Sequence, residues 1–345
     1  MTVNSHANSS TDEQIVMAHG GGGESTRRLL AEHVFPKLRN ELLDPLTDSA
    51  VLNVPPGRIC LTTDAFVVQP LEFRGGDIGT LAVCGTVNDL AVMGATPKAL
   101  SLALIIEQGL PLTTLDRIVD SIAAAARQAG VVIATGDTKV VEHGRGDGMT
   151  ITTAGIGIMR DDVQIAADRI QPGDVVIVTG RIAEHGLAVM SAREHLAFDS
   201  ELTSDVAPLG GLIERLCSDG GDIKFMRDPT RSGLAGVLAD LAETTGLTIE
   251  IDEDVIPISP TAWHAAELLG IDPLTVANEG KCVVVVSAED AERALAACRR
   301  HPLGKRAAII GRVFHRDPAL VELITRAGGR RIIQRPYGEE LPRIC

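Results

Sequence analysis

Apolar residues recur along this chain with two different periods, which predicts a mixture of strands and helices. Leu100, Leu102, Leu104 and Ile106 occupy every second position, as in a half-buried strand. The segment 113–126 instead places its apolar residues three and four apart, as in an amphipathic helix. The elements predicted for the first half are strands at 59–68, 100–106, 131–135 and 150–159 and helices at 26–38, 76–93 and 113–126. This order is typical of a β-α-β domain.

The second half repeats this style after a turn at Gln171-Pro172-Gly173-Asp174. Its predicted elements are strands at 175–178, 223–226, 247–251, 282–287 and 307–313 and helices at 209–217, 233–243, 261–269 and 289–300. The sequence therefore predicts an α+β fold with two domains. The predicted ranges are a disordered extension at 1–14, an N-terminal domain at 15–168, a C-terminal domain at 169–334 and a mobile tail at 335–345.

Composition narrows the class of protein. The 345 residues are 45% hydrophobic and only 2% aromatic, and the net charge is −14. A nucleic-acid-binding protein usually has a basic surface and aromatic stacking residues, so we expect no nucleic-acid partner. No apolar run reaches 18 residues and the first residues are polar, so we expect a cytoplasmic protein with no membrane partner. The six cysteines form no metal-binding or disulfide pattern, and one of them, Cys345, is the last residue.

Four aspartates lie where an apolar element meets a polar or small-residue turn. They are Asp64, Asp89, Asp137 and Asp228, and we expect Asp64 to interrupt its strand. Each of them alone is ordinarily a turn or cap residue. Together they are candidate ligands for magnesium with a triphosphate, because converging carboxylates and phosphates repel unless a divalent cation lies between them.

A glycine-rich loop follows His19. Gly20, Gly21, Gly22 and Gly23 lack the lysine and the spacing of the standard nucleotide-binding loops. Their backbone N–H groups still suit an anion. A plain flexible joint explains the same residues equally well.

Longer segments carry a resemblance to a known family. TTDAFVVQPLEFRGGDIGTLAVCGTVNDLAVMGATPKAL, GDTKVV, RDPTRSGLAGVL, ANEGKC and the terminal PRIC resemble the HypE hydrogenase maturation factors of the PurM-like ATP-using superfamily. The resemblance extends from about residue 14 to the end of the chain. It implies a two-domain PurM-like fold, with an ATP-binding N-terminal domain that pairs with a second copy in a homodimer and with ATP in the cleft between the two domains.

The same resemblance implies an activity. Members of the family are carbamoyl dehydratases that use ATP and Mg²⁺ to convert an S-carbamoyl group on the C-terminal cysteine to S-cyanide. The carbamoyl group comes from the HypF carbamoyltransferase. The cyanide goes to a HypC–HypD complex and becomes an iron ligand of [NiFe]-hydrogenase.

Residue roles follow by motif. The resemblance implies that Cys345 is the carrier and that Lys139 and Glu279 lie beside it. Glu279 is a candidate general base, and Lys139 would neutralise charge on the transferred phosphoryl group or orient the amide. Without the resemblance, a turn carboxylate and a surface salt bridge are the more ordinary interpretations. The implied nucleotide contacts are His19, Gly20, Gly21, Gly22, Gly23, Asp64, Asn88, Asp89, Asp137, Thr138, Asp228 and Arg231, with the four aspartates as metal ligands.

Two other functions stay open at this point. The first is another PurM-like phosphoryl transfer, such as that of selenophosphate synthetase or thiamine-monophosphate kinase. A selenophosphate synthetase normally has a reactive cysteine or selenocysteine near its glycine loop, and here no cysteine precedes Cys60. The second is a non-catalytic scaffold of a maturation complex, which would not need the aspartates together with Lys139. A prenylated cysteine is excluded, because that modification needs it four positions from the end.

Overall fold

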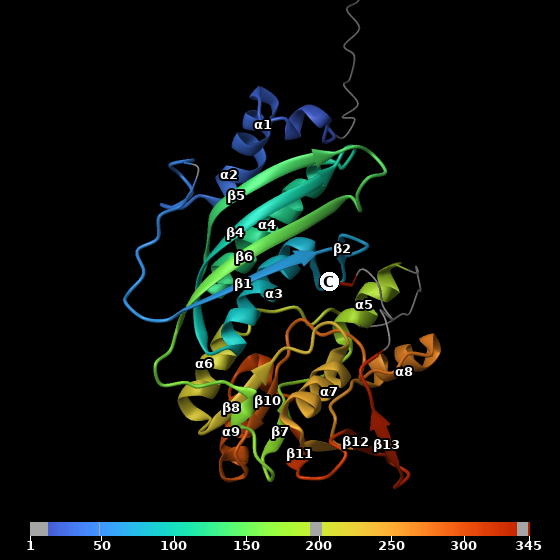
Figure 1. Ribbon diagram of the computed structural model, residues 1–345. Helices are drawn as coiled ribbons and strands as arrows, with labels where there is room; N and C mark the ends of the chain where they lie inside the picture. Colours follow the sequence, from blue (N-terminus) through green and yellow to red (C-terminus); the bar gives the residue numbers. More distant parts are fainter. Residues whose placement is uncertain (1–12, 48, 194–201, 337–343) are drawn as a thin grey trace, which may run out of the picture.

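The computed structural model describes residues 13–47, 49–193, 202–336 and 344–345, and these residues form two domains, one above the other in Figure 1. No helix within these ranges is long and apolar enough to cross a membrane. Residues 1–12 of the predicted extension and 337–343 of the predicted tail lie outside the described residues. Glu13 and Gln14 belong to the folded domain and not to an extension, since the N–H of Leu112 donates to the carbonyl of Glu13 and Gln14 bridges to Pro111.

The N-terminal domain is built on a four-stranded sheet in the order β1-β6-β4-β5. Helices α3 and α4 cover one face of this sheet (Figure 1). Strands β4 and β5 are parallel and are joined through α4, which confirms the predicted β-α-β unit. The elements are β1 (Ile59–Phe66), β2 (Glu72–Phe73), β3 (Gly76–Asp77), α3 (Ile78–Val92), β4 (Ala95–Glu107), α4 (Leu112–Ala129), β5 (Val132–Val141) and β6 (Met149–Met159).

The two faces of this sheet differ in their cover. Helix α4 buries the predicted apolar face, including Leu115 and Ile118, against the sheet. The other face leaves Ile59, Leu61 and Ile105 exposed at 54%, 72% and 39% of their surface. The domain therefore has one buried and one open sheet face.

Strand β1 corrects one expectation. It runs without interruption through Asp64, which pairs with Thr153 of β6. The Thr-Thr-Asp-Ala sequence is thus strand and not a break, because alternate residues point to opposite faces and the polar ones find partners there. Thr62 and Asp64 both hydrogen-bond to side chains of α3.

The segment before the sheet is helical. A 3₁₀ turn (Met17–Gly20) leads to α1 (Glu24–Leu29), a π turn (Leu30–Val34) and α2 (Phe35–Leu38). The predicted helix at 26–38 is therefore present and begins two residues earlier. Gly20 packs against β5, and a Cβ there would lie 2.3 Å from the backbone nitrogen of Val140. The glycine loop consequently lies at the β5 edge of the sheet.

The C-terminal domain contains a seven-stranded sheet in the order β13-β12-β9-β11-β7-β10-β8. Helix α7 packs on one face and α6 and α9 pack on the other. The strands are β7 (Val175–Val178), β8 (Ile223–Arg227), β9 (Thr248–Asp252), β10 (Val283–Val286), β11 (Ala308–Phe314), β12 (Val321–Ile324) and β13 (Arg330–Ile333). The helices are α5 (Glu184–Arg193), α6 (Gly210–Asp219), α7 (Gly233–Thr245), α8 (Pro260–Leu269) and α9 (Ala291–Arg299). The pattern analysis did not predict β12, β13 or α5.

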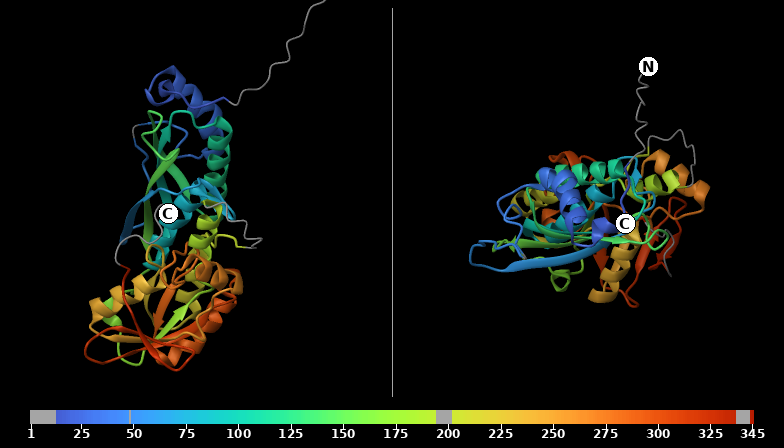
Figure 2. Two further views of the ribbon diagram at one scale, coloured as in Figure 1. Left: turned by 90° about the vertical axis from the view of Figure 1, so that its right-hand side faces the viewer. Right: turned by 90° about the horizontal axis from the view of Figure 1, so that it is seen from above.

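The two domains meet where α3 faces the segment 204–209 and the loop before β10, and the C-terminus lies at this junction (Figures 1 and 2). Arg335, at the start of the predicted tail, forms ion pairs with Asp240 and Glu243 of α7. Ile344, near its end, is 3% exposed. Both described ends of the tail therefore contact the folded domains.

Candidate active site

Asn88 of α3 joins the two domains. Its side-chain amide nitrogen donates to the carbonyls of Ala207 and Glu279, both at 3.1 Å, and its amide oxygen accepts from the N–H of Leu209 at 2.7 Å. The residue is 1% exposed. Both amide donors are therefore used within the protein, and Asn88 holds the backbone that carries Glu279; its predicted nucleotide contact stays a prediction.

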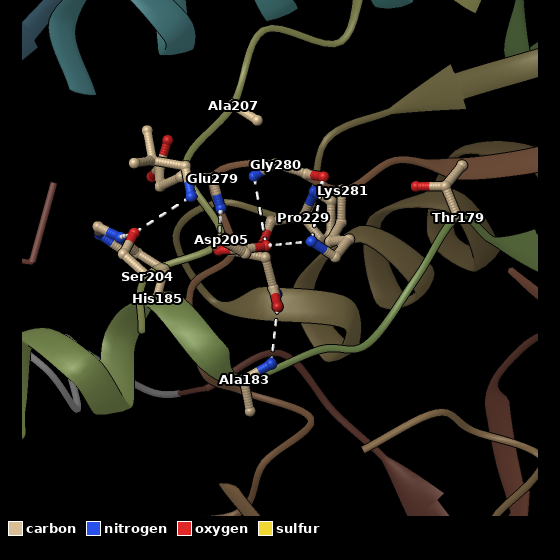
Figure 3. Close-up of polar contacts among 12 residues, drawn as sticks. Thr179, Ala183, His185, Ser204, Asp205, Ala207, Pro229, Glu279, Gly280 and Lys281 are labelled. Atoms are coloured by element: carbon tan, nitrogen blue, oxygen red, sulfur yellow. Dashed lines mark hydrogen bonds and ion pairs between the residues drawn. The ribbon is translucent and has the colours of Figure 1, made fainter. Parts of the chain in front are cut away.

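Asp205 holds the same loop from the other side, as Figure 3 shows. Its carboxylate accepts from the N–H groups of Glu279 and Gly280 and from Nζ of Lys281 at 3.0 Å. Burial acts to raise the pKa of Asp205, but the Lys281 ammonium and the N–H of Glu279 hold it below its usual value. A Cβ at Gly280 would lie 1.8 Å from the carbonyl oxygen of Asp205, so only glycine fits there.

Glu279 and Cys345 lie together at the centre of the junction. Glu279 is 2% exposed, and the Cys345 thiol hydrogen-bonds to its carboxyl group. Burial raises the pKa of Glu279 well above its usual value, and the negative charges of Asp228 and Asp205 raise it further. The structure thus brings together the two residues that the resemblance implies for the carrier and the base, although they are distant in sequence.

Three of the four predicted aspartates lie close to this pair. Burial raises the pKa of Asp228 to about 7, and the charges of Asp89 and Asp64 add to the shift. Burial also raises the pKa values of Asp64 and Asp89, while Arg231 acts to lower both of them. Asp89 accepts from the Thr62 hydroxyl at 2.8 Å, and Asp64 accepts from that of Thr86 at 3.1 Å. These three aspartates form a cluster of acidic groups near Glu279.

The remaining predicted residues lie on the opposite edge of the sheet, in β5: Asp137, Thr138 and Lys139. Gly136 of β5 shares a row of the sheet with Asp64, but β6 and β4 separate their strands, a spacing of about 14 Å. Asp137 and Lys139 point to the open face, where Nζ of Lys139 lies 3.5 Å from Oδ1 of Asp137. Within one chain, then, Lys139 does not lie beside Cys345, and the predicted site residues separate into two groups.

The second group adjoins the glycine loop. Gly22, Thr26, Asp137, Thr138 and Lys139 all line a cavity of about 260 Å³ between the N-terminal helices and β5. The N–H of Gly22 donates to the Thr26 hydroxyl. The predicted phosphate contact His19 is used within its own 3₁₀ turn, where Nδ1 accepts from the N–H of Val16 at 3.2 Å. The N–H groups of the loop thus lie on the same edge as Asp137.

The described part of the chain contains no preformed set of magnesium ligands. No three His, Cys, Asp or Glu side chains there are gathered closely enough to hold a metal ion. The donor chemistry of Asp64, Asp89 and Asp228 nevertheless fits magnesium, because this ion keeps several waters and takes one or two carboxylates together with substrate phosphates. Their raised pKa values show that the site favours added positive charge.

Two non-glycine residues beside the site have left-handed backbone. Ala183 has a φ of 70° and Ser232 a φ of 65°. Asn278 holds the first region in place, because its side chain accepts from the N–H of Ala183 and donates to the carbonyl of Pro229. Strain of this kind is kept where surrounding contacts fix a functional geometry.

Comparison with known proteins decides the family. The model of the AIR synthase related protein N-terminal domain matches residues 46–159, and that of the C-terminal domain matches 171–321. The carbamoyl dehydratase HypE of Rhizobium leguminosarum bv. viciae is 50% identical over 334 residues, 96% of this chain and 95% of that protein. The HypE of Escherichia coli K12 is 42% identical over 96% of this chain and 99% of that protein. The chain belongs to the HypE family of carbamoyl dehydratases.

Solved HypE structures agree with this assignment. HypE in complex with ATP has a TM-score of 0.92 at 40% identity, covering 96% of this chain and 99% of that one. The HypE–HypF complex gives 0.78 at 47% identity, covering 91% and 100%. The resemblance to HypE, the two-domain PurM-like α+β fold and the assignment as an enzyme are therefore confirmed. Thiamine-monophosphate kinase from Stenotrophomonas maltophilia, at 20% identity and a TM-score of 0.64, shares the fold.

Sequence reasoning missed several residues of this site. Asp205, Ser204 and His185 lie in segments that match none of the quoted motifs. Lys281 and Asn278 lie inside the quoted ANEGKC segment but were not singled out. A lysine two residues after a candidate base was a usable signal, because a buried base needs nearby charges to hold its loop and tune its pKa.

Proposed function

We propose that this chain converts an S-carbamoyl group on Cys345 to S-cyanide at the expense of ATP. The observation that carries the proposal is the contact between the Cys345 thiol and the buried Glu279 carboxyl group, beside three aspartates. A group attached to that sulfur would lie against Glu279.

The chemistry requires a leaving group and a base. An amide oxygen leaves poorly, so ATP phosphorylates it and the carbon–oxygen bond then breaks with its electrons on phosphate. The two N–H protons leave during the sequence, and their electron pairs complete the carbon–nitrogen triple bond. Glu279 would accept a proton, because a carboxylate with a raised pKa is a stronger base than an exposed glutamate.

Mg–ATP would be held by the aspartates near Glu279 and by Asp137 beside the glycine loop. Asp64, Asp89 and Asp228 would be the metal ligands near Glu279, and Arg231 supplies a positive charge that acts on Asp64 and Asp89. When bound, magnesium would neutralise the phosphate charge and orient the phosphoryl group for transfer. Backbone N–H groups of Gly20–Gly23 would contribute from the β5 edge, with that of Gly22 exchanging its bond to Thr26 for one to phosphate.

The separation of the two groups supports a homodimer. The open face of the N-terminal sheet exposes Ile59, Leu61 and Ile105, and Asp137 and Lys139 point to the same face. If two open faces packed together about a two-fold axis parallel to the strands, β5 of one copy would lie opposite β1 of the other. Asp137 and Lys139 of one copy would then reach the edge that carries Asp64 of the second.

Partners follow from the reaction. A carbamoyltransferase must load Cys345, and a HypE relative has been solved in complex with HypF. We propose HypF as the donor, a HypC–HypD complex as the cyanide acceptor in [NiFe]-hydrogenase maturation, and the cytoplasm as the location.

The test is the mass of the C-terminal peptide. After incubation with the carbamoyltransferase, carbamoyl phosphate and ATP, it should gain one carbamoyl group, and after removal of that partner fresh Mg–ATP should remove one water. In Glu279→Gln, Cys345 should still accept the carbamoyl group, but its dehydration to S-cyanide should be at least a hundredfold slower. Loading without ATP-dependent loss of water in the native chain would favour the scaffold function, and turnover with another acceptor would favour a different phosphoryl transfer.

A further inference from the structure

The last two residues of the chain are held in place by contacts that have no part in the proposed reaction itself. Ile344 packs against the hydrophobic core of the N-terminal domain and is 3% exposed, while Cys345 is half-buried. The carbonyl oxygen of Ile344 lies 3.0 Å from Nε2 of His185. That carbonyl belongs to the peptide group that joins Ile344 to Cys345, so the bond sets the orientation of the residue carrying the thiol.

His185 has one tautomer that satisfies all its neighbours. The hydroxyl of Ser204 accepts from the N–H of Val206, and its oxygen lies 2.8 Å from Nδ1 of His185. Because the Ile344 carbonyl can only accept, Nδ1 carries no proton and accepts that of the Ser204 hydroxyl. The ring proton then resides on Nε2, where it is donated to Ile344. Burial lowers the pKa of His185, which favours this neutral form over the imidazolium.

Both domains keep the imidazole in this position. His185 belongs to the first turn of α5 and is fully buried. Its ring meets the Phe73 ring edge-on, with centroids 5.4 Å apart and planes at 85°. The N–H of Ser204 donates to the carbonyl of Arg74, which ties the Ser204 segment to the β2–β3 turn of the N-terminal domain. Figure 3 shows the His185–Ser204 pair beside the loop of Glu279.

We propose that His185 is the positioning residue that docks the C-terminus, by donating Nε2–H to Ile344 while the Ile344 side chain is buried, so that Cys345 faces Glu279. Docking itself is a property of the folded chain. Its consequence for dehydration rests on the function proposed above.

The first experiment measures docking without any enzymatic reaction. The alkylation rate of Cys345 by iodoacetamide is followed by mass spectrometry of the C-terminal peptide, with Cys217 of α6 as an internal reference. His185→Ala should raise the rate at Cys345 about tenfold, the effect of one lost buried hydrogen bond, and leave Cys217 unchanged. His185→Gln keeps an N–H donor and should stay near the native rate.

Two further variants make the result decisive. Ile344→Ala should raise the Cys345 rate as well, and combining it with His185→Ala should add little, because both remove the same docked state. His264→Ala is the matched control, since His264 also contacts a backbone carbonyl but is exposed on α8. If His185→Ala also raises the alkylation rate of Cys217, Ser204→Ala is used instead of it and should raise the alkylation rate of Cys345. The proposal is overturned if, in the variant whose Cys217 is alkylated at the native rate, Cys345 is also alkylated at the native rate.

The second experiment separates docking from chemistry. In carbamoyl-loaded protein, His185→Ala should slow single-turnover dehydration about tenfold, with ATP affinity unchanged and His185→Gln restoring the rate. Loading by the carbamoyltransferase should be as fast as in the native chain or faster, because an undocked terminus is accessible. Equal slowing of both half-reactions would indicate a structural role and contradict the proposal. Absence of dehydration in the native chain would instead refute the proposed function, with the alkylation result still standing.

Discussion

The side-chain amide of Asn88 donates to the backbone carbonyl of Glu279, so a residue of the N-terminal domain fixes a carboxylate of the C-terminal domain. The same side chain also binds Ala207 and Leu209. The position of Glu279 therefore depends on correct packing of the two domains. The aspartates of α3 and β1 are brought to it by the same contacts.

Replacing Asn88 should destabilise the domain junction. Asn88→Ala leaves three buried backbone groups without their partner, and we expect a loss of about 3 kcal/mol in the free energy of unfolding, measured by urea denaturation. Dehydration should fall with it. Asn40→Ala is the matched control, since Asn40 also makes several hydrogen bonds, all within the N-terminal domain. It should lower stability without slowing dehydration in the folded protein.

Two glycines should respond differently to alanine, because they are needed for different reasons. Gly280→Ala would place a Cβ 1.8 Å from the Asp205 carbonyl, and we expect a loss of more than about 3 kcal/mol or failure to fold. Gly246 has a φ of +67° but open space around it, so Gly246→Ala should cost about 1 kcal/mol. Thermal and urea unfolding compare the two. Similar losses would show that the Gly280 loop relaxes away from Asp205.

The pH dependence of stability should report the buried carboxyl of Asp228. Its pKa rises from an ordinary value to about 7 on folding, so the folded state binds the proton more tightly than the unfolded chain does. That contribution is fully present below about pH 4 and is lost as pH rises through 7, amounting to at most about 4 kcal/mol. Asp228→Asn should therefore gain stability relative to the native chain between pH 5 and pH 8, in urea denaturation without nucleotide. A difference that does not change with pH would contradict the assignment.

Mixed dimers should reveal whether a site draws on both copies. Asp64→Asn and Asp137→Asn should each abolish ATP-dependent dehydration. When the two inactive variants are exchanged in equal amounts, half of the dimers are mixed, and each mixed dimer would have one intact site if Asp64 and Asp137 act across the interface. Recovery to about a quarter of native activity is expected. No recovery, with mixed dimers shown to form, would place both residues in one protomer's site.

Local sequence patterns by themselves determined most of the secondary structure and the family of this protein. The period of apolar residues predicted the strands and helices of the β-α-β unit, because burial of one face imposes that spacing on any chain. Motifs at Asp64, Asp89 and Asp228, with ANEG and the terminal cysteine, identified the family. Two predictions conflicted with the strands that formed, the break at Asp64 and the strand end before Asp137, because β1 and β5 both run through these residues.

Tertiary structure decided how these residues are used. Asn88 reaches Glu279 across 191 positions and His185 reaches Ile344 across 159, and in both cases the acceptor is a backbone carbonyl. Every residue has such a carbonyl, so nothing in the sequence marks the ones that receive these bonds. The sheet order likewise placed Asp137 and Lys139 at the edge opposite Asp64, because strand neighbours are chosen by packing and not by position in the chain.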